Sequence, residues 1–359
     1  MKNKFIITLF TLILLSCNNF NQQKLPADIE KETQKRIELG YHLGTVIGII
    51  DKEGTRYYGF GQMSLTDSLI PDENSIFEIS SVTKTFTTAL LADLEINNEL
   101  EISNSIEQYL PVFQQVLANN KRTITLEDLV NHTSGLPRNP NNTTTDDSNR
   151  YRDYSVDDLN EYLSGITIDD SGRTYSYSNL AYLVLEQAIE TKTGISYESL
   201  IQERILGILD MNDTYFIVPD EKRDRLVTPY RSGEHVDELD MGEFPASGGL
   251  KTTAKEMLRF LEAQLGMYST TLDPAFKLTQ EERFSNDDVT LGLGWAILKR
   301  EESEKTIHYH KGGSNGFVSF AGFNLEDQIG VVVLTNGHRW FSDLGFKILD
   351  PTYPLSKAE

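Results

Sequence analysis

Apolar and polar positions divide the chain into two blocks of strands with a helical stretch between them. A continuous apolar run at 45–50 predicts a buried strand, and the turn around Gly54 predicts a hairpin that returns over 56–60. Strand-like runs come back from about Gly248 onward. These later predicted strands are Gly292–Leu298, Thr306–His310, Phe317–Asn324 and Gly330–Thr335. The residues after Asn336 give no clear pattern.

The middle of the chain, from about Thr83 to Asn212, repeats apolar residues at helical spacing. The helices expected there are Phe86–Ile96, Leu126–Asn131, Val156–Leu163 and Leu180–Thr193. A further helix is expected near the start, over Pro26–Leu39, and the Asn- and Asp-rich segment 139–153 predicts an exposed loop. We therefore expect an α/β (α+β) fold in which both chain ends form one antiparallel sheet flanked by helices. A mostly helical insert would occupy roughly 90–240.

The first 17 residues have the pattern of an export signal. Lys2 and Lys4 precede an apolar run over Phe5–Leu15, which is too short to span a membrane. The single cysteine of the chain, Cys17, ends this segment and resembles the lipidated cysteine of bacterial lipoproteins. An ordinary signal peptide with an incidental cysteine is the alternative. We interpret 1–17 as a lipoprotein signal, 18–28 as a flexible tether and 29–350 as the folded domain.

The charge of the chain excludes one class of partner. With 33 Lys and Arg against 54 Asp and Glu, the formal charge is −21 among 359 residues. A chain this acidic is not expected to bind nucleic acid through phosphate contacts, and adhesion to anionic lipid is disfavoured as well. Loss of Lys2 and Lys4 with the signal would leave 31 − 54 = −23. A single cysteine allows no intrachain disulfide.

Candidate chemistry begins at Ser81-Val82-Thr83-Lys84, where a serine and a lysine open an apolar helical run. On a helix Lys84 would lie one turn from Ser81, about 5–6 Å away between Cβ atoms. A serine hydroxyl needs a nearby base to become a nucleophile. A lysine serves as that base when burial or neighbouring charge lowers its pKa. The alternative is that Ser81 merely caps the helix, and these four residues alone do not decide between the two.

Two further motifs follow in order and carry a family resemblance. Together, Ser81-Val82-Thr83-Lys84, Tyr177-Ser178-Asn179 and His310-Lys311-Gly312 resemble the three motifs of the serine β-lactamase and penicillin-binding-protein superfamily. The second motif has the form Tyr-x-Asn. This form resembles the second motif of one branch, the class C β-lactamases and their D-Ala-D-Ala carboxypeptidase and esterase relatives. The resemblance runs from about Ile29 to Asn336. Flanking segments that also resemble the family are 126–137, 206–214 and 246–253.

The resemblance implies roles for the first two motifs. Ser81 would attack a carbonyl carbon and form an acyl-enzyme, with Lys84 as the base or its relay. Tyr177 would pass a proton to the leaving group. Its rivals Tyr175 and Tyr151 are not followed by an asparagine two residues later. Asn179 would orient Lys84 and the substrate amide; capping the helix that begins at Leu180 is its alternative role.

The resemblance also assigns the third motif to the strand that lines the pocket. Gly312 would let the backbone approach a substrate closely. The amide of Gly313 would join the amide of Ser81 as an oxyanion hole. Asn139 stands where the family often keeps a substrate-binding amide side chain.

The third motif departs from the β-lactamase pattern, which usually has Lys-Thr-Gly at these positions. His310 replaces the lysine and Lys311 replaces the threonine. Histidine at the first position occurs among carboxypeptidase- and esterase-like relatives, so the change favours peptide or ester cleavage over antibiotic hydrolysis. His310 would donate to a substrate carboxylate or polarise Tyr177, and a purely structural histidine is the alternative.

Metal chemistry is the main competing interpretation of the histidines. His308 and His310 alternate along a predicted strand and would face the same side, with His338 as the nearest further candidate. No Asp, Cys or third His nearby completes a ligand set, so we expect neither metal nor cofactor. His132 is expected to hold a turn between a helix and a loop.

The leading hypothesis is a β-lactamase-related serine hydrolase, and our first choice is a D-amino-acid peptidase or carboxypeptidase acting on cell-wall-type peptides. An esterase comes next, and a class C-like β-lactamase after it. A catalytically silent envelope protein that binds peptidoglycan or a partner protein is the alternative from another class. The expected partners are a small peptide, ester or β-lactam substrate and a lipid anchor, without nucleic acid. We expect a monomer in the cell envelope, anchored by Cys17 on the periplasmic side.

Overall fold

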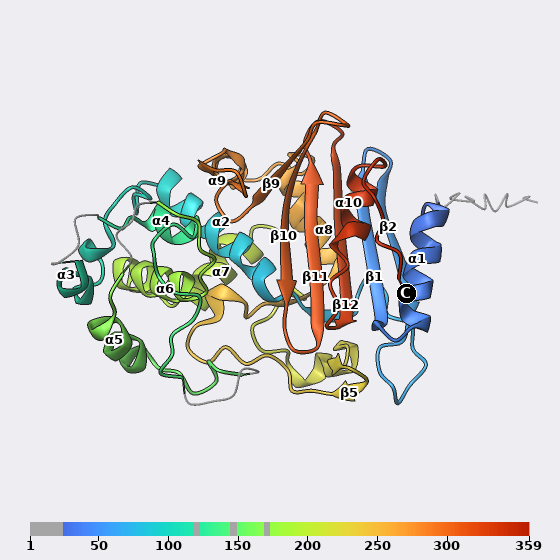
Figure 1. Cartoon of the computed structure of the whole chain (residues 1–359), viewed down its shortest axis with the longest axis horizontal. Helices are drawn as coiled ribbons and strands as arrows, with labels where there is room; N and C mark the ends of the chain where they lie inside the picture. Colours follow the sequence, from blue (N-terminus) through green and yellow to red (C-terminus); the bar gives the residue numbers. More distant parts are fainter. Residues whose placement is uncertain (1–23, 118–122, 144–148, 169–172, 359) are drawn as a thin grey trace, which may run out of the picture.

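The computed structural model describes residues 24–117, 123–143, 149–168 and 173–358 (Figure 1). The predicted signal, with Cys17, and most of the predicted tether lie outside these ranges. None of the helices in the described ranges has the length and apolar content that crossing a bilayer requires.

The main sheet is antiparallel and joins the two ends of the chain, which confirms the predicted fold class. In its described part it has eight strands in the order β2-β1-β12-β11-β10-β9-β8-β7. They are β1 (His42–Asp51), β2 (Gly54–Gly61), β7 (Phe284–Ser285), β8 (Thr290–Leu291), β9 (Ala296–Arg300), β10 (Lys305–Gly313), β11 (Phe317–Asn324) and β12 (Ile329–Gly337). The central join is the pairing of β1 with β12, in which Val46 lies opposite Leu334. Two small pairs lie outside this sheet: β3 (Ile76–Glu78) with β6 (Lys251–Thr253), and β4 (Tyr230–Arg231) with β5 (Glu234–His235).

Helices cover both faces of the main sheet. The helices of the described ranges are α1 (Ala27–Glu38), α2 (Thr83–Ile96), α3 (Val112–Leu117), α4 (Leu126–Val130), α5 (Val156–Gly165), α6 (Leu180–Thr193), α7 (Tyr197–Ile201), α8 (Ala254–Gln264), α9 (Asp273–Gln280) and α10 (Ser342–Leu349), of which α1, α8 and α10 pack on the main sheet. Successive β1 side chains point to opposite faces, as strand geometry requires. Val46 and Ile50 join the core that contains α8, and Ile47 and Ile49 join the core that contains α1 and α10. The helix α10 lies where the sequence gave no clear pattern.

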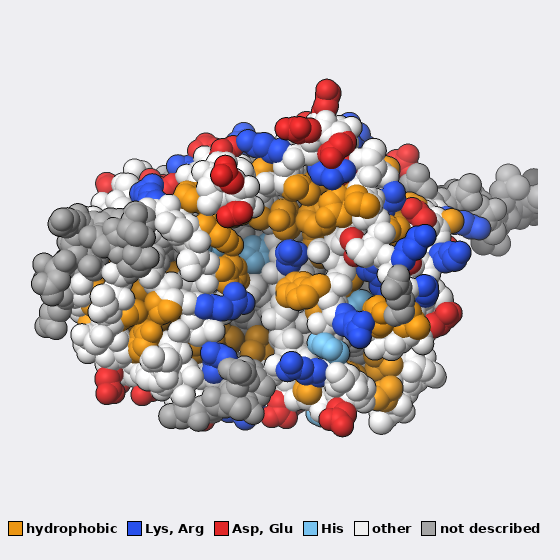
Figure 2. All heavy atoms as spheres, in the orientation of Figure 1, with side chains coloured by type: hydrophobic (Ala, Val, Ile, Leu, Met, Phe, Trp, Pro, Cys, Tyr) orange, Lys and Arg blue, Asp and Glu red, His pale blue; other side chains and the backbone are white. Residues whose placement is uncertain are grey.

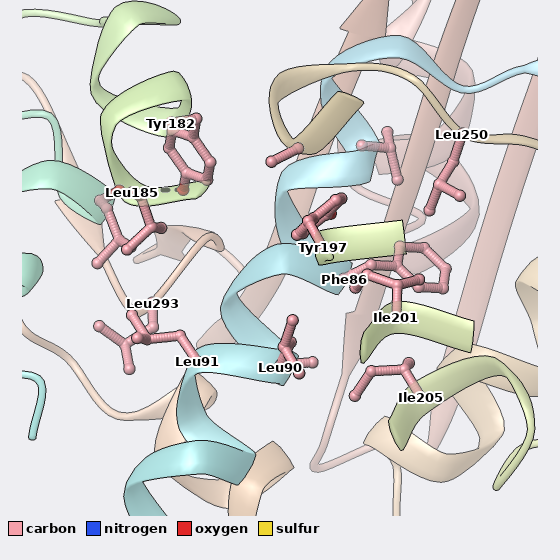
Figure 3. Close-up of a cluster of buried hydrophobic side chains, with 14 of the residues drawn as sticks. Phe86, Leu90, Leu91, Tyr182, Leu185, Tyr197, Ile201, Ile205, Leu250 and Leu293 are labelled. Carbon is pink, nitrogen blue, oxygen red and sulfur yellow. Dashed lines mark hydrogen bonds between the residues drawn. The ribbon is translucent and has the colours of Figure 1, made fainter. Parts of the chain in front are cut away.

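The central helix α2 is buried along almost its whole length, because every residue from Thr83 to Leu94 is buried. Phe86 stacks on Phe260 of α8 with ring centroids 4.0 Å apart. Figure 3 shows α2 carrying Phe86 and Leu90 into the cluster of buried side chains. A helix buried all round is held rigidly by its neighbours, so the residues at its N-terminus have a fixed position. Short helical turns complete the fold: η1 (Ser80–Val82), η2 (Ile106–Gln108), η3 (Gln202–Leu206), η4 (Asp220–Arg225) and η5 (Pro245–Ser247).

One predicted strand was wrong in its bounds. Of the expected strand over Gly292–Leu298, only the part from Ala296, where β9 begins, is a strand, and β8 ends at Leu291, before the predicted range. Between them Gly294 adopts a left-handed conformation with φ of 75°. A Cβ atom there would lie 2.3 Å from Thr88 Oγ1 on α2, so only glycine lets the chain pass this close to the helix. The break is therefore imposed by a tertiary contact.

Candidate active site

Ser81 lies in the short turn η1, directly before α2. The preceding residue, Ser80, has a φ of 47°, a left-handed conformation that costs energy for a residue with a side chain. Neighbouring strands hold this turn in place: Ser319 Oγ donates to the Ile79 carbonyl at 2.7 Å, and a Cβ atom on Gly312 would lie only 2.1 Å from that oxygen. The strained turn aims the half-buried Ser81 side chain into the space beside β10.

Lys84 is fully buried, and its Nζ atom has three oxygen neighbours. Asn179 Oδ1 lies at 2.9 Å, the carbonyl of Ser247 at 2.5 Å and Ser81 Oγ at 3.4 Å. Burial lowers the pKa of Lys84 well below its usual value, and the positive charge of Arg138 lowers it further. A neutral amine has two N–H donors and one lone pair. When Asn179 and Ser247 accept the two donors, the lone pair is left for the Ser81 hydroxyl proton.

Tyr177 approaches Ser81 from the other side. Its hydroxyl donates to Ser81 Oγ at 3.0 Å. Burial raises the pKa of Tyr177, although the hydrogen bond to Ser81 and the charge of Arg138 oppose the rise. Tyr177 is therefore a phenol with a proton to give, rather than a phenolate acting as a base. Ser81 Oγ consequently lies between a proton acceptor and a proton donor.

His132 and Arg138 hold the Tyr177 ring. The His132 ring packs against it at 4.3 Å between centroids, and the Arg138 guanidinium carbon lies 4.9 Å from its centroid. His132 has a φ of 57° and its Nδ1 accepts from the Ser178 amide at 3.2 Å. Burial lowers the pKa of His132 well below its usual value, so its ring is neutral. The predicted turn-holding role of His132 agrees with this geometry.

The two rival tyrosines do not contact Ser81. The Tyr151 hydroxyl lies 2.8 Å from the side-chain amide of Asn139, and Tyr175 lines the cavity beside Ser81. The Asn139 amide lies 3.0 Å from the Asn179 amide nitrogen. The structure thus brings Asn139 next to Asn179, and through it next to Lys84.

The β10 residues named from the sequence also lie at the site. His310 and Gly313 line a cavity of about 320 Å³ together with Ser81. Burial lowers the pKa of His310 to about 3, so a neutral ring faces this cavity near pH 7. The ring Nδ1 lies 3.0 Å from the Lys311 carbonyl. His310 can therefore offer a substrate a neutral hydrogen-bonding group but no positive charge.

The structure does not bring the three histidines of the metal hypothesis together. The His308 ring is buried against Phe323 at 5.0 Å, and its Nε2 lies 3.1 Å from the Gln280 carbonyl. His338 Nδ1 accepts from the Ser232 amide. Within the described ranges, no three His, Cys, Asp or Glu side chains are grouped as metal ligands.

Comparison with known proteins decides the family. A family model described as Beta-lactamase matches residues 30–346, which is most of the chain. The chain belongs to the β-lactamase family.

Proteins with different names are similar to this chain. The D-alanyl-D-alanine-carboxypeptidase/endopeptidase AmpH of Escherichia coli (strain K12) is 27% identical over 310 residues, covering 81% of this chain and 78% of that protein. A protein named β-lactamase from the same strain is 25% identical over 361 residues, covering 90% of this chain and 92% of the relative. A solved class C β-lactamase has the same fold, with a TM-score of 0.80 at 20% identity, covering 94% of this chain and 99% of that structure.

Sequence reasoning missed two groups of this β-lactamase-family site. The Ser247 carbonyl is a backbone atom, so no residue type marks it; the loop that carries it is held by Glu186, which accepts from the Ala246 amide at 2.9 Å. Arg138 was missed because it lies in an irregular segment, directly before Asn139, where no periodic pattern points to a single residue. Its charge acts on Lys84, Tyr177 and His132 together.

The role of Arg138 can be tested through the pH dependence of Ser81 reactivity. A base must be unprotonated, so the rate is full above the pKa of Lys84 and falls as the pH drops through it. Replacing Arg138 by Gln removes a repelling charge and raises that pKa. We expect the acidic limb of the pH–rate profile to move to higher pH by roughly one unit, the size expected for one neighbouring charge. The measurement is the second-order rate of Ser81 labelling by an alkyl fluorophosphonate, whose fluoride leaving group needs no proton from Tyr177.

Arg138→Lys is the matched control, because it keeps the positive charge and should leave the limb close to its original pH. If the acidic limb lies at the same pH in the wild-type protein and in the Arg138→Gln variant, and circular dichroism shows that both are folded, Arg138 does not lower the pKa of Lys84.

Proposed function

We propose that this member of the β-lactamase family is a serine hydrolase that works through an acyl-enzyme on Ser81. The observation that carries the proposal is the position of Ser81 Oγ, 3.0 Å from the Tyr177 hydroxyl and 3.4 Å from Lys84 Nζ. A nucleophile with a base at one side and an acid at the other is suited to acyl transfer. The alternative of a catalytically silent binding protein gives no reason for Lys84 to be buried beside Ser81.

The proposed steps move two protons. Lys84 takes the proton of Ser81 as Oγ bonds to the substrate carbonyl carbon, and the carbonyl oxygen becomes an oxyanion that the amides of Ser81 and Gly313 would hold. The bond from carbon to the leaving nitrogen or oxygen then breaks, and the leaving atom takes the Tyr177 proton. The proton held by Lys84 returns to Tyr177. Water completes the reaction by attacking the acyl-enzyme, which releases the acid and restores Ser81.

For the substrate we propose a peptide with D-amino acids, cleaved as a carboxypeptidase cleaves it. Two points support this choice over a β-lactam. His310 and Lys311 stand where β-lactamases usually have Lys-Thr, and one similar protein is named a D-alanyl-D-alanine-carboxypeptidase/endopeptidase. A β-lactam, placed third after an ester from the sequence alone, becomes the second candidate, because another relative is named β-lactamase and a solved neighbour is titled β-lactamase/D-alanine carboxypeptidase.

A labelled penicillin tests the acyl-enzyme. We expect one adduct per chain on a Ser81-containing peptide, measured by intact-protein and peptide mass spectrometry on protein lacking residues 1–17. The Ser81→Ala variant should give no adduct, and Ser80→Ala, which removes the adjacent hydroxyl, should still be labelled. Absence of an adduct on folded protein, with both penicillin and a fluorophosphonate, would refute the hydrolase proposal.

If the adduct forms, rates with D-Ala-D-Ala peptides, short-chain nitrophenyl esters and nitrocefin rank the substrates. Steady nitrocefin turnover above the peptide rate would overturn the proposed preference.

We also propose that Cys17 is lipidated and holds the protein at a membrane of the cell envelope, facing the periplasm. The support is the basic and apolar segment before it and the polar residues after it. Cys17→Ser, expressed in a bacterial host with the full signal, should move the protein from the membrane fraction to the soluble fraction. Ser16→Ala, which keeps the cysteine, is the control. Unchanged fractionation of Cys17→Ser would refute lipidation as the anchor.

A further inference from the structure

Two hollows meet at Ser81. The aromatic hollow, of about 320 Å³, is lined among others by Tyr175, Tyr177, Tyr309 and Trp340. The arginine hollow, of about 370 Å³, is lined among others by Arg138, Arg150 and Arg231. Ser81, Arg138 and Gly313 line both, so a substrate whose carbonyl carbon reaches Ser81 would extend into each hollow.

The charge of these hollows opposes the charge of the chain. The chain has a formal charge of −21, yet no Asp or Glu is among the described residues that line either hollow. Figure 2 shows blue Lys and Arg side chains around the hollow in the middle of this face, with red Asp and Glu side chains mainly at its margins. A cleft of one sign in a protein of the other sign attracts ligands of the protein's own sign.

Carboxylates close to the arginine hollow are already engaged. Glu78 is buried beneath it and accepts from Ser314 Oγ at 2.7 Å and from the Leu239 amide at 2.6 Å. Asp237 and Asp240 each lie 3.5 Å from the guanidinium of Arg152.

Two of the three arginines that line this hollow have a charge that is available to a ligand. Neither Arg138 nor Arg231 has an ion pair with any residue in the described ranges. Their positive charge is therefore available to a ligand that enters the hollow.

The position of Tyr177 tells which part of a substrate enters each hollow. Tyr177 lines the aromatic hollow but not the arginine hollow. In the proposed reaction Tyr177 gives its proton to the leaving group, so the leaving group occupies the aromatic hollow. The acyl part, which stays bonded to Ser81, then extends into the arginine hollow. The amide side chains of Asn139 and Asn179 line this second hollow and suit the polar backbone of a peptide.

We propose that the arginine hollow binds a carboxylate on the acyl side of the substrate, so that the preferred acyl donors are acidic. This inference rests on the proposed hydrolase function and adds a substrate class to it. A guanidinium binds a carboxylate through charge-assisted and often bidentate hydrogen bonds, which favours Arg231 and Arg138 as the partners. Because Arg231 is solvent-exposed, its contribution should weaken as salt screens it.

Two esters that differ in one group test the inference. The 4-nitrophenyl monoester of adipic acid carries a free carboxylate, and the ester of its primary amide is a neutral match of nearly the same shape. At low ionic strength we expect kcat/KM to be about tenfold higher for the acidic ester, mainly through KM, as a charge-assisted hydrogen bond would give. The ratio of kcat/KM for the acidic ester to kcat/KM for the neutral ester should fall several-fold in 0.5 M salt, a concentration at which exposed charges are strongly screened. Arg231→Gln should lower this ratio several-fold, because only Arg138 then remains as a partner for the carboxylate.

Lys52→Gln is the control for net charge, because Lys52 lies exposed in the turn between β1 and β2, outside both hollows. It should leave both rates unchanged. A ratio of one or less in the wild-type protein, or a ratio that neither salt nor Arg231→Gln lowers, would overturn the acidic preference while leaving the hydrolase proposal intact. Failure of both esters to acylate Ser81, followed by mass spectrometry, would instead count against the proposed function itself.

Discussion

The burial of Lys84 among three oxygen atoms is the constraint on which the rest of the site depends. A charged lysine would lose the stabilisation of water there, so burial favours the neutral amine. The three oxygens come from Ser81 before α2, Asn179 at the start of α6 and Ser247 in η5. No single segment could supply them. The fold must therefore bring three distant parts of the chain to within about one hydrogen-bond length of one nitrogen.

The fold meets this requirement by burying α2 on all sides and setting the sheet beside its N-terminus. Strand β10 can approach the turn before α2 because Gly312 has no Cβ atom to meet the Ile79 carbonyl. The same approach leaves His310 and Gly313 facing Ser81. The helical part contributes Tyr177 and Arg138 from the opposite side. The cleft between the two parts is thus both the proposed reaction centre and the place where positive side chains gather in an acidic protein.

Local patterns predicted much of the fold. The bounds of α6 and β11 agree with their predicted ranges because each shows a long uninterrupted apolar pattern. The three motifs identified the side chains around Ser81 because each chemical role requires a particular residue type. Patterns failed where a distant contact decides the structure. The contact with Thr88 at Gly294 separates β8 from β9. The Ser247 carbonyl reaches Lys84 as a backbone atom that any residue type could supply.

The central claim is that Lys84 is a neutral amine when it takes the Ser81 proton. The most direct measurement is a pH titration of the lysine side-chain ¹³Cε resonances by nuclear magnetic resonance, with Lys84 assigned by its absence from the Lys84→Met spectrum. Exposed lysines should titrate near 10.4, which serves as the reference. We expect Lys84 to have the chemical shift of a neutral amine at pH 8 and to titrate well below that reference. A Lys84 resonance that stays in the ammonium range up to pH 10 would contradict this claim.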